Sequence, residues 1–203
     1  MNLPNKLSVL RICLVPVFVI VMMLPQNMLP YFDIWGTLLG ALIFIVASLT
    51  DMLDGKIARK YNLITDFGKF IDPLADKFMV IGALLVLMYR NAGVPYVFPV
   101  LTAATMIIIF RELAVTSIRL VASSSSGVVI AAKYIGKIKT VSQIICICAV
   151  ILEPLIYSLI TPLSFLSVYM PLTYLTTAVT VIFTVWSGID YLVSYWKYLD
   201  PQK

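Results

Sequence analysis

Residues 50–77 read TDMLDGKIARKYNLITDFGKFIDPLADK, an acidic stretch in a chain that is otherwise mostly apolar. On a helix, Asp51 and Asp54 are three residues apart and share one face. Asp72 and Asp76 are four residues apart and share one face of the helix that follows. The polar segment between the two helices is short, so the helices must be neighbours. The stretch therefore predicts two adjacent helices that present four carboxylates to one pocket.

The composition is that of a membrane protein. Hydrophobic residues make up 61% of the 203 residues, 12% are charged, and the mean hydropathy is +1.00. Soluble domains contain about 45–50% apolar residues. The length leaves room for about six spans of ~20 residues and for no sizeable soluble domain. We therefore expect an all-α integral membrane protein with a single domain, residues 1–203.

Turn signals between the apolar runs predict six transmembrane helices, near residues 12–25, 34–60, 68–90, 95–122, 134–159 and 172–198. Residues 2–11 place Leu3, Leu7 and Leu10 at helical spacing between polar residues, which predicts a short N-terminal interfacial helix. With the N-terminus in the cytoplasm, every Lys and Arg except Arg90 falls on the cytoplasmic side. We expect a multi-pass protein of the cell membrane, with both termini and the carboxylates facing the cytoplasm.

Several ionised carboxylates at membrane depth need a compensating cation or a water-filled cavity, because each costs about 2.5–3.5 kcal/mol there. The chain has no histidine, and oxygen ligands suit Mg²⁺, Mn²⁺ or Ca²⁺ rather than zinc. We expect two divalent ions, Mg²⁺ or Mn²⁺, at Asp51, Asp54, Asp72 and Asp76. Asp66 is interpreted instead as a helix-entry residue. In the alternative, the acids form structural ion pairs with neighbouring basic residues: Lys56, Arg59, Lys69 and Lys77.

The stretch resembles the signature of the CDP-alcohol phosphatidyltransferases at every fixed position: Asp51-x2-Asp54-Gly55-x2-Ala58-Arg59-x8-Gly68-x3-Asp72-x3-Asp76. The segments NLPNKLSVLRICLVPVF, GKFIDPLADK, RELAVTSIRL and GKIKT are similar to bacterial members that make phosphatidylglycerophosphate. The resemblance implies transfer of the phosphatidyl group of CDP-diacylglycerol to sn-glycerol 3-phosphate, with release of CMP. It also implies a homodimer. We expect membrane lipids as further partners, and no nucleic acid.

The same resemblance implies roles for the signature residues. The diphosphate of CDP-diacylglycerol would bridge two ions held by the four aspartates, so that Asp51, Asp54 and Asp72 also bind the CDP group. Asp76 would in addition be the general base, which suits a chain without histidine. The small residues would let a large substrate approach the backbone. The remaining positions that would shape the CDP pocket are Gly55, Ala58, Arg59 and Gly68.

The phosphate of the acceptor needs a second anion site. Arg111 and Arg119 are eight residues apart, near one face of the fourth predicted span, and Lys137 and Lys139 open the fifth. Arg suits bidentate phosphate contacts, and Lys supplies a mobile point charge. We expect these four residues to bind glycerol 3-phosphate. Their alternative role is to set topology and to contact anionic lipids.

Two other functions stay open. A sister transferase could use phosphatidylglycerol, as in cardiolipin synthesis, or inositol phosphate, as in phosphatidylinositol phosphate synthesis. The basic residues favour a phosphorylated acceptor but do not identify its carbon skeleton. A small cation transporter could use the aspartates as an ion site, but the carboxylates lie at one membrane face and the sequence has no visible inverted repeat.

Overall fold

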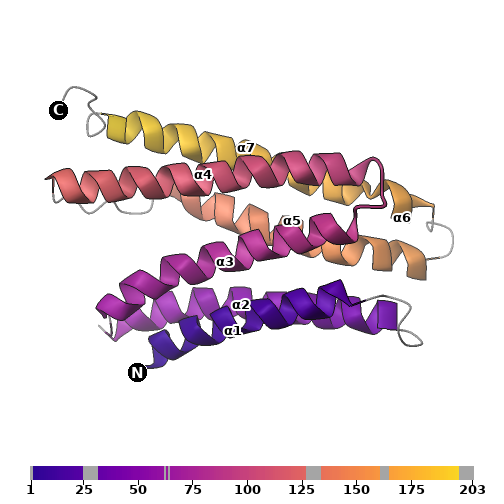
Figure 1. Cartoon of the computed structure of the whole chain (residues 1–203), viewed down its shortest axis with the longest axis horizontal. Helices are drawn as coiled ribbons and strands as arrows, with labels where there is room; N and C mark the ends of the chain where they lie inside the picture. Colours follow the sequence, from indigo (N-terminus) through magenta and orange to yellow (C-terminus); the bar gives the residue numbers. More distant parts are fainter. Residues whose placement is uncertain are drawn as a thin grey trace.

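The structure, a computed structural model, describes residues 2–24, 32–61, 63, 65–126, 134–160 and 165–196. These ranges contain no strand, and their helices are α1 (Leu3–Met23), α2 (Phe32–Lys60), α3 (Asp66–Arg90), α4 (Val97–Ser126), α5 (Tyr134–Leu159), α6 (Leu166–Tyr169) and α7 (Pro171–Tyr195). The long helices run side by side along the bundle, and α6 is a short turn before α7 (Figure 1). The predicted all-α membrane architecture is confirmed. The predicted span ends at residues 25 and 197–198 lie outside the described ranges.

Five segments of the described chain are long and apolar enough to cross a membrane: Leu3–Met23, Asp33–Ala58, Val97–Val121, Tyr134–Leu159 and Leu166–Tyr195. α3 is not among them, because charged residues interrupt its first half and Arg90 ends it. Its 25 residues still match the ~30 Å hydrocarbon core at 1.5 Å per residue. The helix packs against α1, α2, α4 and α5 on one side, while its other side exposes large apolar side chains such as Phe70 and Leu85.

The first long helix is continuous from Leu3 to Met23, so the predicted interfacial helix is the first half of α1. Asn2 caps this helix by accepting a hydrogen bond from the Asn5 N–H. The polar side chains Asn5, Ser8 and Arg11 are buried in the protein. Their helical spacing is also typical of an interfacial helix, which explains the difference from the prediction.

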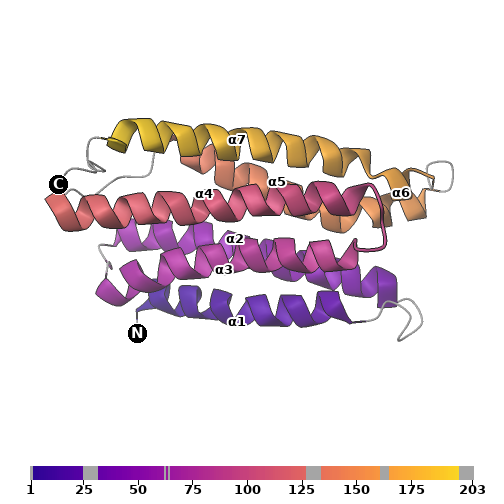
Figure 2. The same ribbon diagram turned by 45° about the horizontal axis from the view of Figure 1, so that its top comes forward.

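Successive long helices run in opposite directions, so their ends alternate between the two ends of the bundle (Figures 1 and 2). The start of α1, the end of α2 and the start of α3 lie at one end. The end of α4, the start of α5 and the end of α7 lie there too. The acidic stretch and the predicted phosphate-binding residues therefore share an end.

The bundle has two parts. In one, α1 packs against both α2 and α3; in the other, α7 packs against α4 and α5. Contacts of α5 with α2 and α3, and of α4 with α3, join them. The shared core includes Phe18, Phe44, Leu87, Leu101 and Ile147. Large apolar side chains also cover much of the outside, as expected for helices in contact with lipid.

Small polar residues form the buried face of α7. Thr173, Thr177, Thr180, Thr184 and Ser187 recur every three or four residues, and small side chains allow membrane helices to approach closely. α5 in turn caps the start of α7 with a buried carboxylate. Glu153 accepts hydrogen bonds of 2.6 Å from the N–H groups of Leu172 and Thr173, where the helix dipole favours a negative charge.

Candidate active site

Arg11 of α1 lies between the carboxylates of α2 and α3. Its Nη1 is 2.9 Å from Asp51 Oδ1 and 2.6 Å from Asp76 Oδ1. Its Nη2 is 2.5 Å from Asp54 Oδ2. The Arg11 side chain is fully buried, and its Nε has no hydrogen-bond partner. Three carboxylates from two helices thus converge on one cation from a third helix.

Ser8, one turn before Arg11, contacts the remaining carboxylate. Its hydroxyl donates to Asp72 Oδ1 at 2.5 Å and lies 3.4 Å from Asp54 Oδ2. We call the four aspartates together with Ser8 and Arg11 the acidic cluster. The structure therefore brings all four predicted metal-binding residues together, but α1 forms a wall of the site that the signature does not contain.

Close packing at the start of α3 fixes α1 beside the acidic cluster. Thr65 caps α3 by accepting a hydrogen bond from the Gly68 N–H at 3.0 Å, and Asn5 Nδ2 donates to the same Thr65 oxygen at 3.0 Å. Gly68 is buried, and a Cβ there would lie 3.0 Å from Asn5 Oδ1. The missing side chain thus makes room for α1. Asp66 is the first residue of α3, which confirms its interpretation as a helix-entry residue.

Exposure rises across the acidic cluster. The side chain of Asp54 is 6% exposed, that of Asp51 30%, and that of Asp76 48%. Asp54 therefore forms the floor of the site, and Asp76 lies at its mouth. Gly55 and Ala58 are half-buried on α2. The side chains of Arg59 and Lys69 lie outside the described part of the structure.

The acidic cluster fits hard divalent cations by its chemistry. Its ligands are oxygens, and four carboxylates against one guanidinium leave a formal charge of −4 + 1 = −3. As the described side chains stand, no three His, Cys, Asp or Glu residues are grouped around one metal-sized point, because Arg11 lies between the carboxylates. Divalent ions at these oxygens would require Arg11 to give up some of its contacts.

A second group of charges lies at the same end of the bundle. Lys139 of α5 forms a buried ion pair with Glu112 of α4, and Arg111 Nη1 lies 3.3 Å from the same carboxylate oxygen. Arg119 Nη2 donates to the Tyr191 hydroxyl of α7 at 2.6 Å. We call these five residues the basic cluster. Its formal charge is +3 − 1 = +2.

The four residues predicted to bind the acceptor phosphate differ in availability. Lys139 is buried and already paired with Glu112, whereas Lys137 is exposed at the start of α5. Arg111 and Arg119 each have a buried Nε without a hydrogen-bond partner. The two arginines therefore retain buried donors that an anion could use.

The acidic and basic clusters face each other. α3 packs against both α4 and α5, and Asp76 at the mouth of the acidic cluster interacts electrostatically with Lys139. Lys77, the next residue of α3, interacts in the same way with Glu112. The charges at the mouth of the acidic cluster are therefore within electrostatic range of the basic cluster.

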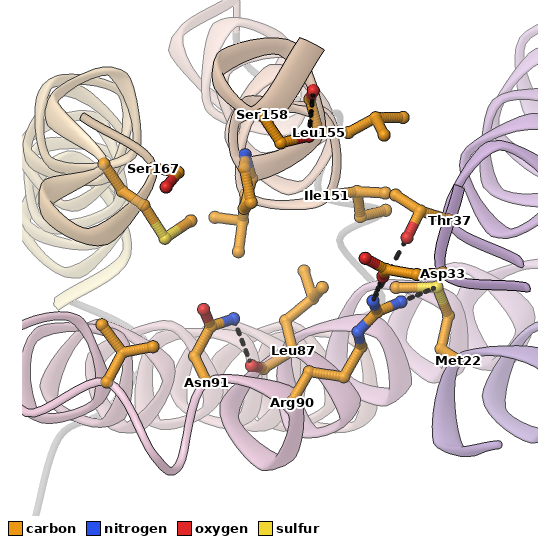
Figure 3. Close-up of a pocket in the computed structure, with 14 residues that line it drawn as sticks. Met22, Asp33, Thr37, Leu87, Arg90, Asn91, Ile151, Leu155, Ser158 and Ser167 are labelled. Atoms are coloured by element: carbon orange, nitrogen blue, oxygen red, sulfur yellow. Dashed lines mark hydrogen bonds and ion pairs between the residues drawn. The ribbon is translucent and has the colours of Figure 1, made fainter. Parts of the chain in front are cut away.

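A cavity of about 310 Å³ lies at the opposite end of the bundle (Figure 3). Arg90 lines it, with Nη2 3.2 Å from Thr37 Oγ1, Nη1 3.2 Å from Met22 Sδ, and Asp33 3.9 Å away. Arg90 lies 14 residues after Asp76 on α3, or about 21 Å along the helix. The cavity is therefore separate from the acidic cluster.

Reasoning from sequence missed four residues of the two clusters: Ser8, Arg11, Glu112 and Tyr191. A signal for the first two was present, because Asn5, Ser8 and Arg11 recur every three residues and so share a helix face. Glu112 follows Arg111 directly, and adjacent residues do not share a face, but the long side chains still meet. Asp190 and Tyr191 in the last predicted span are ambiguous in the sequence, which gives no contact for Tyr191.

Two clusters of opposite charge at one end of a bundle of membrane-type helices make up the candidate site. The chain belongs to the CDP-alcohol phosphatidyltransferase family, whose model matches residues 1–186. Members of this family generally depend on divalent metal ions.

Curated relatives match along most of their length. A protein of Bacillus subtilis (strain 168) is 41% identical over 98% of this chain and 97% of its own. One from Yersinia enterocolitica is 34% identical over 99% of both chains, and one from Pectobacterium atrosepticum is 38% identical over 75% of this chain and 78% of its own. All three are named CDP-diacylglycerol–glycerol-3-phosphate 3-phosphatidyltransferase.

Proposed function

We propose that this chain transfers the phosphatidyl group of CDP-diacylglycerol to sn-glycerol 3-phosphate and releases CMP. The observation that carries the proposal is the pair of facing clusters at one end of the bundle, because the reaction brings together a diphosphate and a separate phosphate. Similarity to three proteins named for this reaction, two of them matched over nearly their full length, supports the choice of acceptor.

The acidic cluster is the proposed donor site. Asp51, Asp54, Asp72 and Asp76 would hold two Mg²⁺ or Mn²⁺ ions, which when bound stabilise negative charge on the diphosphate of CDP-diacylglycerol. Arg11, freed from some of its carboxylates, stays next to that diphosphate and adds a fixed positive charge. The CDP group would bind along the small and basic positions of the signature: Gly55, Ala58, Arg59 and Gly68.

The basic cluster is the proposed acceptor site. Arg111 and Arg119 would bind the phosphate of glycerol 3-phosphate through guanidinium donors that have no partner in the protein. Lys137 is exposed and would add a mobile positive charge for the same anion. Lys139 would contribute mainly through its positive charge at the site and not through a direct contact, since its ammonium group is already paired with Glu112.

In the proposed step, a primary hydroxyl oxygen of glycerol 3-phosphate attacks the phosphorus that carries diacylglycerol. The new O–P bond forms as the anhydride O–P bond breaks, and CMP leaves with that bond's electron pair. The hydroxyl proton passes to Asp76, which lies at the mouth of the acidic cluster and is 48% exposed. Asp76 thus touches the acceptor, whereas the more buried Asp54 touches only the donor side.

The orientation of the protein in the membrane is proposed from the distribution of its basic residues. Basic residues gather at the end of the bundle that contains both clusters, which supports a cytoplasmic active site and cytoplasmic termini in the cell membrane. Open flanks between the helices would leave the acyl chains of the donor in the bilayer. A homodimer and contacts with other membrane lipids follow from the family resemblance. The whole chain would act as one domain.

The proposal is tested on purified protein in detergent with CDP-diacylglycerol and Mn²⁺ or Mg²⁺. CMP release is followed while glycerol 3-phosphate, inositol phosphate, phosphatidylglycerol and serine are added one at a time. We expect release that needs both the metal ion and glycerol 3-phosphate, and that is lost in Asp76→Asn. Release with another acceptor would keep the family and overturn the acceptor; release with none would favour the cation transporter.

A further inference from the structure

Tyr191 of α7 contacts both arginines of the basic cluster. Its ring centre lies 5.0 Å from Cζ of Arg119 and 5.7 Å from Cζ of Arg111. Its hydroxyl accepts the 2.6 Å hydrogen bond from Arg119 Nη2. The Tyr191 side chain is fully buried. One aromatic residue from α7 therefore holds two guanidinium groups from α4.

Two guanidinium groups beside one ring repel each other unless something compensates. The face of an aromatic ring attracts cations, most strongly where water is excluded. The hydroxyl adds a charge-assisted hydrogen bond that fixes the orientation of Arg119. Glu112 offsets part of the positive charge through its contact with Arg111. Tyr191 and Glu112 together keep Arg111 and Arg119 close while leaving a net positive charge.

Each of the two arginines also has a hydrogen-bond donor without a partner. The side chain of Arg111 is only 10% exposed, and the buried Nε atoms of Arg111 and Arg119 have no hydrogen-bond partner. A buried donor without an acceptor costs free energy. A phosphate group has several acceptor oxygens and two negative charges, and so matches this pair.

The surface of α7 around Tyr191 is shaped to seat the arginines. Gly188 lies one turn earlier, and a Cβ there would come within 3.2 Å of Arg111 Cγ. Tyr195 lies one turn later and stacks on Tyr191, with ring centres 5.9 Å apart. The absence of a side chain at Gly188 thus gives Arg111 its place, and Tyr195 supports the ring of Tyr191.

We propose that Tyr191 is a positioning residue that sets the spacing and orientation of Arg111 and Arg119 for the phosphate of the acceptor. The inference rests on the proposed function and adds to it a residue of α7. Tyr191 acts through the arginines and does not touch the reacting atoms. Its effect therefore falls on the binding of the acceptor and not on that of CDP-diacylglycerol.

The test compares Tyr191→Phe and Tyr191→Leu with the control Tyr89→Phe, which removes a hydroxyl from an exposed tyrosine at the opposite end of the bundle. For each purified full-length protein, the KM of glycerol 3-phosphate, the KM of CDP-diacylglycerol, and the inhibition constant of inorganic phosphate against glycerol 3-phosphate are measured. The Tm of each protein is measured as well. A purely structural role would change the Tm and both KM values together.

Loss of one charge-assisted hydrogen bond in Tyr191→Phe should raise the KM of glycerol 3-phosphate and the inhibition constant of phosphate about fivefold to tenfold. In Tyr191→Phe, the KM of CDP-diacylglycerol and the Tm should stay near the wild-type values. In the control Tyr89→Phe, all measured values should stay near those of the wild type. Tyr191→Leu should raise the same two constants further; if it does not fold, Tyr191→Phe decides alone. Unchanged constants in Tyr191→Phe, or equal rises for both substrates, would overturn the inference.

Failure of the proposed function has a different signature. If the wild type uses another phosphorylated acceptor, the acceptor identity is overturned, and a higher KM for that acceptor in Tyr191→Phe supports the role of Tyr191. If the wild type uses only an acceptor without a phosphate monoester and inorganic phosphate does not inhibit it, both the proposed function and this inference are overturned.

Discussion

The acidic and basic clusters are built alike: each contains an excess of charges of one sign and one charge of the opposite sign. In the acidic cluster, one buried cation, Arg11, contacts three of the four carboxylates. In the basic cluster, one carboxylate, Glu112, pairs with a lysine and an arginine while Tyr191 holds the second arginine. Each internal counter-charge offsets only part of the excess. The acidic cluster therefore keeps a net negative charge and the basic cluster a net positive charge.

The clusters differ in where the counter-charge comes from. Arg11 belongs to α1, whereas the acids belong to α2 and α3, so the packing of three helices forms the acidic cluster. Glu112 is the sequence neighbour of Arg111, so part of the basic cluster is local to α4. Removing each counter-charge should therefore have effects that the matching ligand can reverse, divalent cations in one case and phosphate in the other.

The largest expected effect comes from removing the proposed base at the mouth of the acidic cluster. Asp76→Asn keeps the shape of the side chain but cannot accept a proton, so kcat should fall by about 10²–10⁴-fold. The measurement is metal-dependent CMP release with glycerol 3-phosphate. Asp66→Asn is the matched control, because Asp66 is exposed at the first position of α3. Equal losses in both variants would remove Asp76 from the chemistry.

The next effect comes from the counter-charge of the acidic cluster. Removal of one partner of a buried ion pair costs about 3–5 kcal/mol, so Arg11→Gln should lower the Tm strongly in a chelator. Added Mn²⁺ should recover much of the loss, because it supplies the missing positive charge. Arg90→Gln, at the other end of α3, should lower the Tm by an amount that Mn²⁺ does not change. The same Mn²⁺ response in both variants would refute the idea.

A smaller effect is expected at the counter-charge of the basic cluster. Glu112→Gln removes the negative charge, but the amide oxygen can still accept a hydrogen bond from Lys139, so the cost should be about 1–3 kcal/mol of unfolding free energy. Inorganic phosphate should stabilise this variant more than the wild type, as judged by the Tm with and without phosphate. Stabilisation by Mn²⁺ in place of phosphate would show that the two clusters do not act separately.

The smallest effect should come from a buried carboxylate outside both clusters. Glu153→Gln weakens the cap on α7 and should cost about 1 kcal/mol. Thermal unfolding should show equal losses with and without Mn²⁺ or phosphate. A loss that either ligand reverses would mean that the start of α7 is coupled to the site.

Much of the fold could be predicted from the sequence because lipid imposes simple rules. Long apolar runs must be helices, and the turn signals between them located the described long helices to within a few residues. The start of α1 differed because Asn5, Ser8 and Arg11 make a polar face that suits either a membrane surface or a buried site. Periodicity gives the face of a helix but not its neighbour.

The parts of the site whose residues are close in sequence were predicted, and the contacts between distant segments were not. The aspartates are close in sequence and lie on two consecutive helices, so spacing alone brought them together. Arg11 is 40 residues from Asp51, and Tyr191 is 72 residues from Arg119. Contacts across such distances depend on how the helices pack, and no spacing rule supplies them. The pairing of Lys139 with Glu112 likewise became visible only in three dimensions.

The most direct measurement follows one oxygen atom through the reaction. Purified protein is given CDP-diacylglycerol, Mn²⁺ and glycerol 3-phosphate labelled with ¹⁸O in its primary hydroxyl, and the products are analysed by mass spectrometry. If the facing clusters direct the acceptor hydroxyl to the lipid-bearing phosphorus, the label will be in phosphatidylglycerophosphate, and CMP will contain none. Label in a nucleotide product, with release of phosphatidic acid, would mean attack on the other phosphorus and would contradict this mechanism.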